Sequence, residues 1–241
     1  MLLKACLNGP TKRDAHPSVP QTPAELAADA AAVVAAGAGA VHLHPRDSSG
    51  AETLEPDSVL AAVAAVRAAI PAPVGVTTGL WAVGGDAARR MSLVARWVGP
   101  DRPDFASVNL SEPGAAELAA LLASLGIAVE AGIWTPDDAD RLAGTFGGEV
   151  LRILVEPHDR TPDGAVALAA DIEAALDRHG LTAPRLHHGY GPATWLVLRA
   201  ALRQGRDIRV GLEDTVVLPD GRPASGNREL VETAVRLASE V

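Results

Sequence analysis

The sequence predicts an α/β protein with the TIM (β/α)8 barrel fold, in a single domain that covers residues 1–241. Short apolar runs alternate along the chain with alanine-rich segments. About eight such repeats fit into 241 residues, close to the usual length of roughly 250 residues for this fold. An open, doubly wound sheet is the alternative. No Gly-x-Gly-x-x-Gly follows the first apolar run, however, and no Walker-type Gly-Lys-Ser/Thr motif occurs in the chain.

Strands are expected at the short apolar runs that contain β-type residues. Each run is apolar on both faces and precedes a helical segment, which is typical of a parallel sheet covered by helices. The expected strands span residues 2–7, 40–44, 74–78, 105–110, 128–133, 150–155, 185–188 and 208–212.

Helices are expected in the alanine-rich segments between these strands. Several begin with a Thr-Pro or Pro-Asp pair, such as Thr22-Pro23 and Pro56-Asp57, which is common at a helix start. The last segment carries Leu230, Ala234 and Leu237 at helical spacing. The expected helices span residues 23–36, 56–69, 114–125, 136–144, 162–178, 192–203 and 227–239.

Composition excludes several classes of function. The formal net charge of −9 argues against a nucleic-acid partner, because binding to a phosphate backbone needs a basic surface. Cys6 is the single cysteine, so no internal disulfide or multi-cysteine zinc site can form. No apolar stretch reaches the roughly 18 residues of a membrane span, and the N-terminus lacks the features of a signal peptide. We therefore expect a cytoplasmic protein without a membrane partner.

A barrel places its active site at the carboxyl ends of the strands. Polar residues are concentrated at these ends of the expected strands, which makes them candidates for the site. They are Asn8, His42, His44, Thr77, Thr78, Ser107, Asn109, Glu130, Glu156, His187, His188, Arg209, Glu213 and Asp214.

The tetrapeptide Val41-His42-Leu43-His44 is the most informative of these segments. Side chains alternate along a strand, so His42 and His44 share one face. Inside a barrel that face is the lumen, where two neutral imidazoles can bind a divalent cation. The alternative is a pair of core histidines that are hydrogen-bonded to their neighbours.

Two histidines need a third ligand, and Glu213 is the leading candidate. It ends a strand whose lumen face would carry Arg209, Gly211 and Glu213, next to the first two strands in a closed barrel. Zn²⁺ suits such a set, with Mn²⁺ and Fe²⁺ as alternatives. Glu213 could instead be a rim carboxylate paired with Arg209.

His187 and His188 are rival ligands, although adjacent residues point to opposite faces, so at most one enters the lumen. Glu130 is a further inward candidate, with an ion pair as its alternative role.

A bound cation would polarise a substrate carbonyl and stabilise an enolate. Lys4 and Lys12 are the only lysines, one at the start of the first strand and one in a loop. A Schiff base and a lumen lysine as bridging ligand are therefore not expected. Asp214, beside Glu213 and within reach of Arg209, is a candidate general base, or else a loop carboxylate that caps a turn.

The dipeptide Arg46-Asp47 follows the two histidines directly. Either side chain could orient one imidazole from behind, as carboxylates do at metal-binding histidines. A salt bridge at the barrel rim is the alternative role.

Two blocks of sequence resemble the β-keto acid cleavage enzymes, a family typified by 3-keto-5-aminohexanoate cleavage enzyme. The N-terminal block combines Leu7-Asn8-Gly9, His16-Pro17-x-x-Pro20-x-Thr22-Pro23 and Val41-His42-Leu43-His44-Pro45-Arg46-Asp47. The C-terminal block combines Val210-Gly211-Leu212-Glu213-Asp214 with Asn227-x-Glu229. The resemblance therefore spans essentially the whole chain.

This resemblance implies a TIM barrel that binds Zn²⁺ through His42, His44 and Glu213. The implied reaction is a Claisen and retro-Claisen acyl transfer, in which a β-keto acid and acetyl-CoA give acetoacetate and a new acyl-CoA. In it, Asp214 would act as the base with help from Arg209. The resemblance also implies a homo-oligomer, commonly a tetramer.

Further site residues follow from the same resemblance. The family uses small polar groups at the ends of strands three and four, for which Thr78, Ser107 and Asn109 are the matching positions. Asn8, after the first strand, is added as a substrate-binding candidate. Glu130 resembles the family's strand-five glutamate and is therefore expected to be catalytic.

Two other functions remain as alternatives. A metal-dependent hydrolase could use the same ligands, although its His-x-His usually lies on the first strand and its metal site commonly includes a lysine. A catalytically inactive barrel that binds a ligand or partner is the third possibility. No long exposed apolar stripe in the sequence supports that reading.

Overall fold

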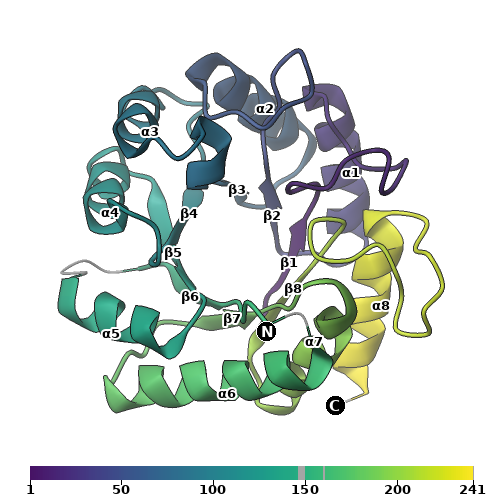
Figure 1. Ribbon diagram of the computed structural model, residues 1–241. Helices are drawn as coiled ribbons and strands as arrows, with labels where there is room; N and C mark the ends of the chain where they lie inside the picture. The colour runs from purple at the N-terminus through teal and green to yellow at the C-terminus, as the bar shows by residue number, and fades with distance from the viewer. Residues whose placement is uncertain (146–149, 160, 241) are drawn as a thin grey trace.

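The computed structural model describes residues 1–145, 150–159 and 161–240. Eight parallel strands form a closed barrel in the order β1 to β8, and β8 pairs with β1 to close it (Figure 1). Helices surround the barrel on the outside (Figure 1). The predicted TIM barrel is therefore confirmed. No helix in the described ranges is both long and apolar enough to cross a membrane.

Seven strands lie within the predicted runs, mostly as shorter segments, and the eighth begins one residue before its predicted run. They are β1 (Leu3–Cys6), β2 (Ala40–Leu43), β3 (Val74–Val76), β4 (Phe105–Asn109), β5 (Ala128–Ile133), β6 (Arg152–Val155), β7 (Arg185–His187) and β8 (Asp207–Val210). The α-helices are α1 (Pro23–Ala35), α2 (Pro56–Ala69), α3 (Ala87–Val94), α4 (Ala115–Ser124), α5 (Pro136–Thr145), α6 (Pro162–Arg178), α7 (Thr194–Arg203) and α8 (Asn227–Ser239). Two short 3-10 turns, η1 (Leu80–Val83) and η2 (Gly191–Ala193), follow β3 and β7.

Helix α1 shows why the Thr-Pro pairs mark helix starts. The N–H of Glu25 donates to the Thr22 hydroxyl at 3.3 Å, and the N–H of Thr22 donates to the Glu25 carboxylate at 3.0 Å. This reciprocal cap satisfies two backbone donors that the helix leaves free, and such a cap stabilises a helix by about 1 kcal/mol.

Helix α3 is absent from the sequence prediction. It has only eight residues and is capped by the preceding Asp86, whose carboxylate accepts the N–H of Arg89 at 2.9 Å. Its buried positions are Arg90, Leu93 and Val94. Because a buried arginine replaces an apolar residue on the inner face, the segment lacks the apolar periodicity that reveals a helix.

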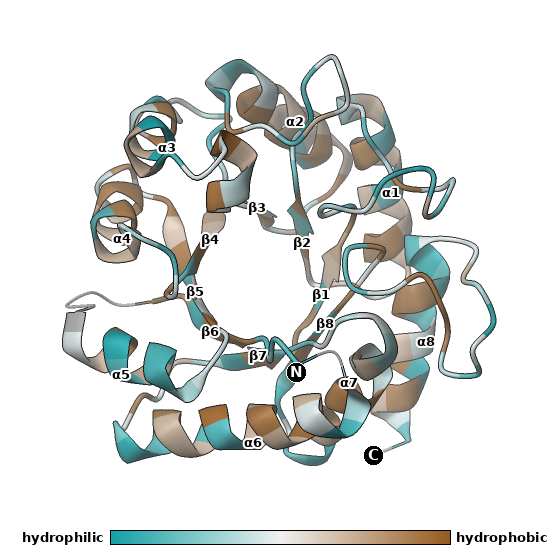
Figure 2. Cartoon of the chain, viewed as in Figure 1, coloured by the Kyte–Doolittle hydropathy of each residue, from teal (hydrophilic) through white to brown (hydrophobic). Residues whose placement is uncertain are grey.

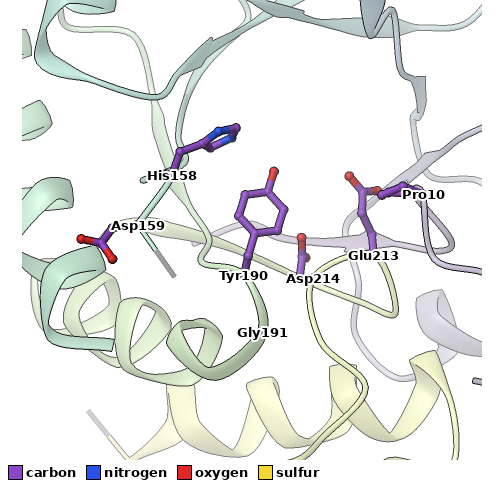
Figure 3. A pocket seen from close by; sticks show the side chains of 7 residues that line it. All are labelled: Pro10, His158, Asp159, Tyr190, Gly191, Glu213 and Asp214. Atoms are coloured by element: carbon purple, nitrogen blue, oxygen red, sulfur yellow. The ribbon is translucent and has the colours of Figure 1, made fainter. Parts of the chain in front are cut away.

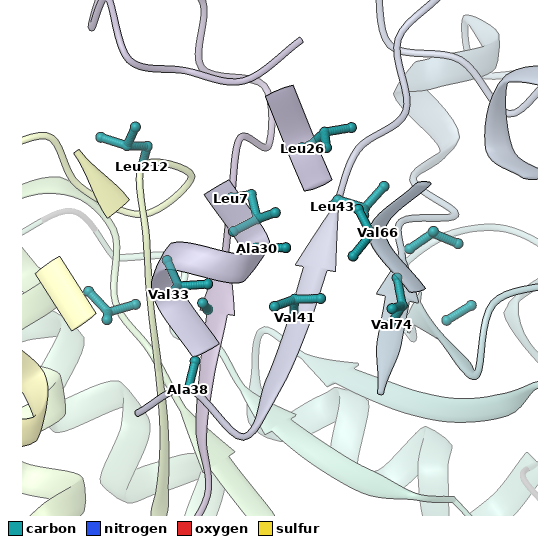
Figure 4. Packing of buried hydrophobic residues seen from close by; sticks show 14 of the residues in the cluster. Leu7, Leu26, Ala30, Val33, Ala38, Val41, Leu43, Val66, Val74 and Leu212 are labelled. Carbon is teal, nitrogen blue, oxygen red and sulfur yellow. The ribbon is translucent and has the colours of Figure 1, made fainter. Parts of the chain in front are cut away.

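The main apolar core lies between the barrel and its helices. Leu26 and Val33 of α1 pack in one cluster with Val41 and Leu43 of β2 (Figure 4). Apolar residues are distributed over both strands and helices, as Figure 2 shows. Since Val41 and Leu43 face outward into this core, the residues that alternate with them face the lumen.

Ionic and aromatic side chains fill the amino-terminal end of the lumen. The Lys4 ammonium lies 2.5 Å from one Glu130 oxygen, and an Arg152 nitrogen lies 2.9 Å from the other. Both cations also lie over the Phe105 ring, at 5.7 and 5.4 Å from its centroid. Lys4 does enter the lumen, but it pairs with Glu130 at the end opposite to the strands' carboxyl ends, where it is not available as a bridging metal ligand.

Candidate active site

Three predicted metal ligands converge at the carboxyl end of the barrel. His42, His44 and Glu213 each offer a ligand atom, and these atoms all lie within 4.8 Å of one another. The Nε2 atom of His42 lies 3.9 Å from Glu213 Oε2, and that of His44 lies 3.5 Å from Glu213 Oε1. The arrangement is a possible metal-binding triad.

Backbone packing between β1 and β8 brings Glu213 to this position. An added Cβ on Gly211 would lie 1.9 Å from the Cys6 carbonyl oxygen, so only glycine allows the two segments to come this close. Asn227, at the start of α8, accepts the N–H of Leu212 and donates to the Leu7 carbonyl, both at 2.7 Å. The turn that carries Glu213 is thus fixed from both sides.

The donor set fits a divalent cation such as zinc. Two imidazoles and one carboxylate are a common protein contribution to a catalytic zinc site. Buried His42 Nδ1 and Glu213 Oε2 have no hydrogen-bond partner among the residues that the structure describes. Burial lowers the pKa of His42 well below its usual range, so its imidazole is neutral. Burial opposes ionisation of Glu213, but Arg209 and His44 hold the pKa of its carboxyl well below the usual range.

Arg209 joins this triad to Asp214. Its Nη2 atom donates to Glu213 Oε1 at 2.5 Å and to Asp214 Oδ1 at 2.7 Å, while its Nε atom donates to Asp214 Oδ1 at 3.1 Å. Burial disfavours the charged guanidinium, but Asp214 and neighbouring groups raise the pKa of Arg209 well above its usual value. The predicted base therefore lies beside the ligand set, oriented by a charged arginine.

Glu52 is a site residue that the sequence analysis missed. One of its oxygens contacts Nδ1 of His44, and the other accepts a hydrogen bond from Trp81 Nε1 at 3.0 Å. It lies eight residues after His44, and an antiparallel bridge between Arg46 and Glu52 brings it back to the histidine. No strand or helix pattern in the sequence reveals such a loop contact.

Arg46 and Asp47 do not orient the imidazoles, so that expectation is wrong. Arg46 donates to the backbone carbonyls of Gly9 and Thr11. Asp47 accepts the N–H groups of Ser49 and Ala51 and so closes its own loop. Their role is to shape the loop that carries Glu52.

Glu156 organises the wall of the site opposite the triad. It accepts hydrogen bonds from Trp134 Nε1 at 2.9 Å and from the Tyr190 hydroxyl at 3.1 Å, and it contacts His188 Nε2 at 2.9 Å. Burial raises the pKa of Glu156, but the His188 contacts outweigh it and lower the pKa to about 2. The wall therefore contains a charged carboxylate surrounded by aromatic side chains.

Of the adjacent histidines, only His188 faces the lumen. Its Nδ1 atom lies 3.4 Å from Asp214 Oδ1. His187 points outward, where its Nε2 atom contacts Glu173 of α6 at 2.7 Å. Neither histidine belongs to the possible metal cluster found among the described residues.

Two adjoining cavities open on this group. One, of about 200 Å³, lies between the triad and the Glu156 wall. The other, of about 330 Å³, borders Asp214 and Gly191 (Figure 3). Both are lined by His158, Tyr190 and Glu213, and Tyr190 stands between the other two in Figure 3. The two cavities therefore adjoin at Tyr190 and Glu213.

A family model for the β-keto acid cleavage enzymes matches residues 1–241. The chain belongs to the β-keto acid cleavage enzyme family. It is accordingly an enzyme that breaks carbon–carbon bonds in β-keto acids, as the sequence motifs predict.

Two curated relatives are 3-keto-5-aminohexanoate cleavage enzymes. The one from Acetoanaerobium sticklandii is 25% identical over 252 residues, covering 95% of this chain and 87% of the relative. The one from Fusobacterium nucleatum is 24% identical over 266 residues, with the same coverage. These matches extend over nearly the whole barrel.

Solved structures show the same fold. The apo structure of ObcA has a TM-score of 0.73 at 22% identity, covering 91% of this chain, and the ternary complex of ObcA with C4-CoA adduct and oxalate has a TM-score of 0.73 at 21% identity. The chain spans only 61% and 63% of those two chains. The 3-dehydroquinate dehydratase from Aquifex aeolicus has a TM-score of 0.62 at 15% identity.

In this β-keto acid cleavage enzyme, Ser107 and Asn109 of β4 line the cavity beside the triad, as expected of substrate-binding residues. Thr78 does not. Its hydroxyl donates to the Ser107 carbonyl oxygen at 2.5 Å, and Thr77 lines the cavity in its place. Alternation along β3 explains the difference, because only one of two successive side chains can face the lumen.

Two other expected site residues lie outside both cavities formed by the described residues. Asn8 holds the backbone of His44: its Nδ2 donates to the His44 carbonyl at 2.9 Å, and its Oδ1 accepts the His44 N–H at 2.8 Å. Glu130 is enclosed by Lys4 and Arg152 in the lower lumen. Its placement favours a structural role over the expected catalytic one.

Proposed function

We propose that the protein is a zinc-dependent acyltransferase. It would convert a β-keto acid and acetyl-CoA into acetoacetate and a new acyl-CoA. The observation that carries the proposal is the ligand set His42, His44 and Glu213 beside the Arg209–Asp214 pair. The ObcA complex with a C4-CoA adduct supports a CoA thioester as partner for this barrel. We further propose that the enzyme acts in the cytoplasm as a homo-oligomer, in keeping with the tetramers common in the family.

Zinc bound by His42, His44 and Glu213 would act as a Lewis acid that favours the enolate of the keto acid. Asp214 takes the proton from the carbon between the keto and carboxyl groups, and Arg209 orients its carboxylate toward that carbon. Ser107 and Asn109 bind the keto acid within the cavity. Thr78 and Asn8 act indirectly, through the backbones of Ser107 and His44 respectively.

The enolate carbon then attacks the acetyl carbonyl and expels the CoA thiolate. The thiolate adds to the original keto carbon, and the bond between that carbon and the central carbon breaks. This releases the new acyl-CoA and the acetoacetate carbanion, to which Asp214 returns its proton. In this proposal the keto acid and the acetyl group of the thioester would meet where the two cavities adjoin at Glu213.

The decisive experiment uses the zinc-loaded protein with acetyl-CoA and a panel of β-keto acids. Mass spectrometry of the CoA pool should show one new acyl-CoA, accompanied by an equal amount of acetoacetate. Glu213→Gln should lose bound zinc and activity together. Turnover of the keto acid with water alone would overturn the proposal in favour of a hydrolase, as would full activity of a zinc-free Glu213→Gln.

A further inference from the structure

We propose that Glu52 is a positioning residue of the metal centre, which fixes the imidazole of His44 and holds the indole of Trp81 beside it. The inference rests on the proposed metal site. The proposed role belongs to a glutamate in a loop, and this glutamate is not part of any motif identified in the sequence.

The contact between Glu52 and His44 determines which ring nitrogen faces the metal. An ionised carboxylate can only accept hydrogen bonds, so the His44 proton lies on Nδ1, which contacts Glu52. Nε2 is then the ring nitrogen that faces Glu213, 3.5 Å away, and that a metal would bind. Asn8 already fixes the backbone of His44 through two hydrogen bonds. Glu52 fixes the remaining freedom, the orientation of the ring.

His42 and His44 differ in the partner of their Nδ1 atoms. His42 Nδ1 has no hydrogen-bond partner in the described part of the chain, whereas His44 Nδ1 has a carboxylate. A carboxylate behind a histidine ligand raises its basicity and fixes its tautomer, and its loss commonly reduces metal affinity by about 10–100-fold. We therefore expect the metal centre to depend on Glu52 through His44.

The loop that carries Glu52 is itself built to place it. The Arg46–Glu52 bridge returns the chain to His44, and Arg46 ties the loop to the segment after β1 by donating to the Gly9 and Thr11 carbonyls. The Glu52 side chain is only 12% exposed, so its carboxylate is held within this contact network rather than in solvent.

Trp81 is the second group that Glu52 holds. Its Nε1 donates to Glu52 at 3.0 Å, and its indole stacks on the His44 ring with 6.2 Å between centroids and 23° between planes. The indole folds across Gly79, where an added Cβ would lie 2.3 Å from its Cζ2 atom. Trp81 also lines the cavity beside the triad. One carboxylate thus connects a metal ligand to a wall of the substrate cavity.

The test measures zinc affinity of the metal-free protein, by competition with a chromophoric chelator and without substrate. Glu52→Gln should weaken zinc binding by about 10–100-fold while the melting temperature of the metal-free protein stays unchanged. Glu55→Gln is the matched control, because Glu55 lies in the same loop, is exposed and pairs with surface Arg89. Its zinc affinity should stay within about twofold of wild type.

Trp81→Phe separates the two roles. It keeps an aromatic ring but removes the donor to Glu52, so we expect a higher KM for the keto acid with near-wild-type zinc affinity. Wild-type zinc affinity in Glu52→Gln overturns the inference. If Glu52→Gln does not fold, Glu52→Asp is tested instead. The shorter side chain keeps the negative charge but moves it away from His44, so the same loss of zinc affinity is expected. A wild-type protein that binds zinc but transfers no acyl group contradicts the proposed function and leaves the role of Glu52 standing.

Discussion

Gly9 lies directly against the side chain of Glu213. A Cβ added to Gly9 would come within 2.1 Å of Glu213 Cγ. Gly9 also has a φ of +53°, a conformation that favours glycine over residues with a side chain. The dipeptide Asn8-Gly9 therefore contributes to the metal site twice, since Asn8 holds His44 and Gly9 leaves the space that Glu213 occupies.

We expect Gly9→Ala to displace the Glu213 carboxylate from the two histidines. Zinc affinity should fall by at least about tenfold, as for loss of a group that orients a ligand. Gly205→Ala is the control, because Gly205 has a similar φ of +65° but no heavy atom within 4 Å of an added Cβ. Equal zinc affinities in the two variants would contradict the role of Gly9 in leaving space for Glu213.

Asp214→Asn tests the proposed base. The amide cannot accept the proton of the keto acid, so kcat should fall by about 10²–10⁴-fold. Zinc affinity should change little, because Asp214 is not a member of the triad. Asp159→Asn, at the border of the neighbouring cavity, serves as the comparison. Steady-state kinetics with the zinc-loaded variants measure both effects, and substantial activity in Asp214→Asn would remove Asp214 from the mechanism.

Glu130→Gln distinguishes a structural from a catalytic role for Glu130. The change leaves the buried Lys4 ammonium without its carboxylate, which should reduce the free energy of unfolding by about 3 kcal/mol. The folded protein should keep its kcat. Urea unfolding and kinetics measure the two quantities separately, and adding Lys4→Met should recover part of the lost stability. A large loss of kcat at unchanged stability would instead support the catalytic role.

Glu173 makes stability depend on pH. Burial raises the pKa of Glu173, but contacts with His187 and Arg185 outweigh it and lower the pKa to about 2. Because the folded-state pKa lies below the unfolded value, this stabilisation is complete above about pH 5 and is lost as the pH falls toward 2.

Glu173→Gln should therefore cost about 2 kcal/mol near pH 7, after allowance for solvent screening, and much less near pH 3. Unfolding in urea at several pH values gives this difference. Glu232→Gln, which removes an exposed helical pair with Arg228, should show little change at any pH. A cost for Glu173→Gln that does not vary with pH would contradict the assignment.

The sequence predicts the barrel and the triad because both depend on simple periodicities. Alternation along β2 places His42 and His44 on the lumen side, and closure of the barrel brings Glu213 beside them. The same alternation shows that only one of His187 and His188 can face inward. Whether His187 or His188 faces the lumen depends on the register of β7 relative to its neighbouring strands, and the sequence does not reveal this register.

The groups that the sequence analysis missed lie mainly in loops or depend on them. Glu52 reaches His44 through a return of the chain, and Trp81 reaches Glu52 through the 3-10 turn after β3. Such contacts have no periodicity, because they depend on how each loop folds back on the barrel. Asn227 shows the converse: it belongs to a recognisable motif, but its two hydrogen bonds hold the backbone of the Glu213 turn rather than a substrate.

The packed layer of Lys4, Glu130, Arg152 and Phe105 gives the barrel a closed floor. The lumen is therefore open to solvent at the end where the strands' carboxyl ends meet, which forms the rim of the barrel. The loops that line the two cavities follow the carboxyl ends of the strands, whereas this floor lies at the opposite end. Loops from other members of the family could thus be exchanged at the rim to alter which keto acid is accepted, without altering the floor.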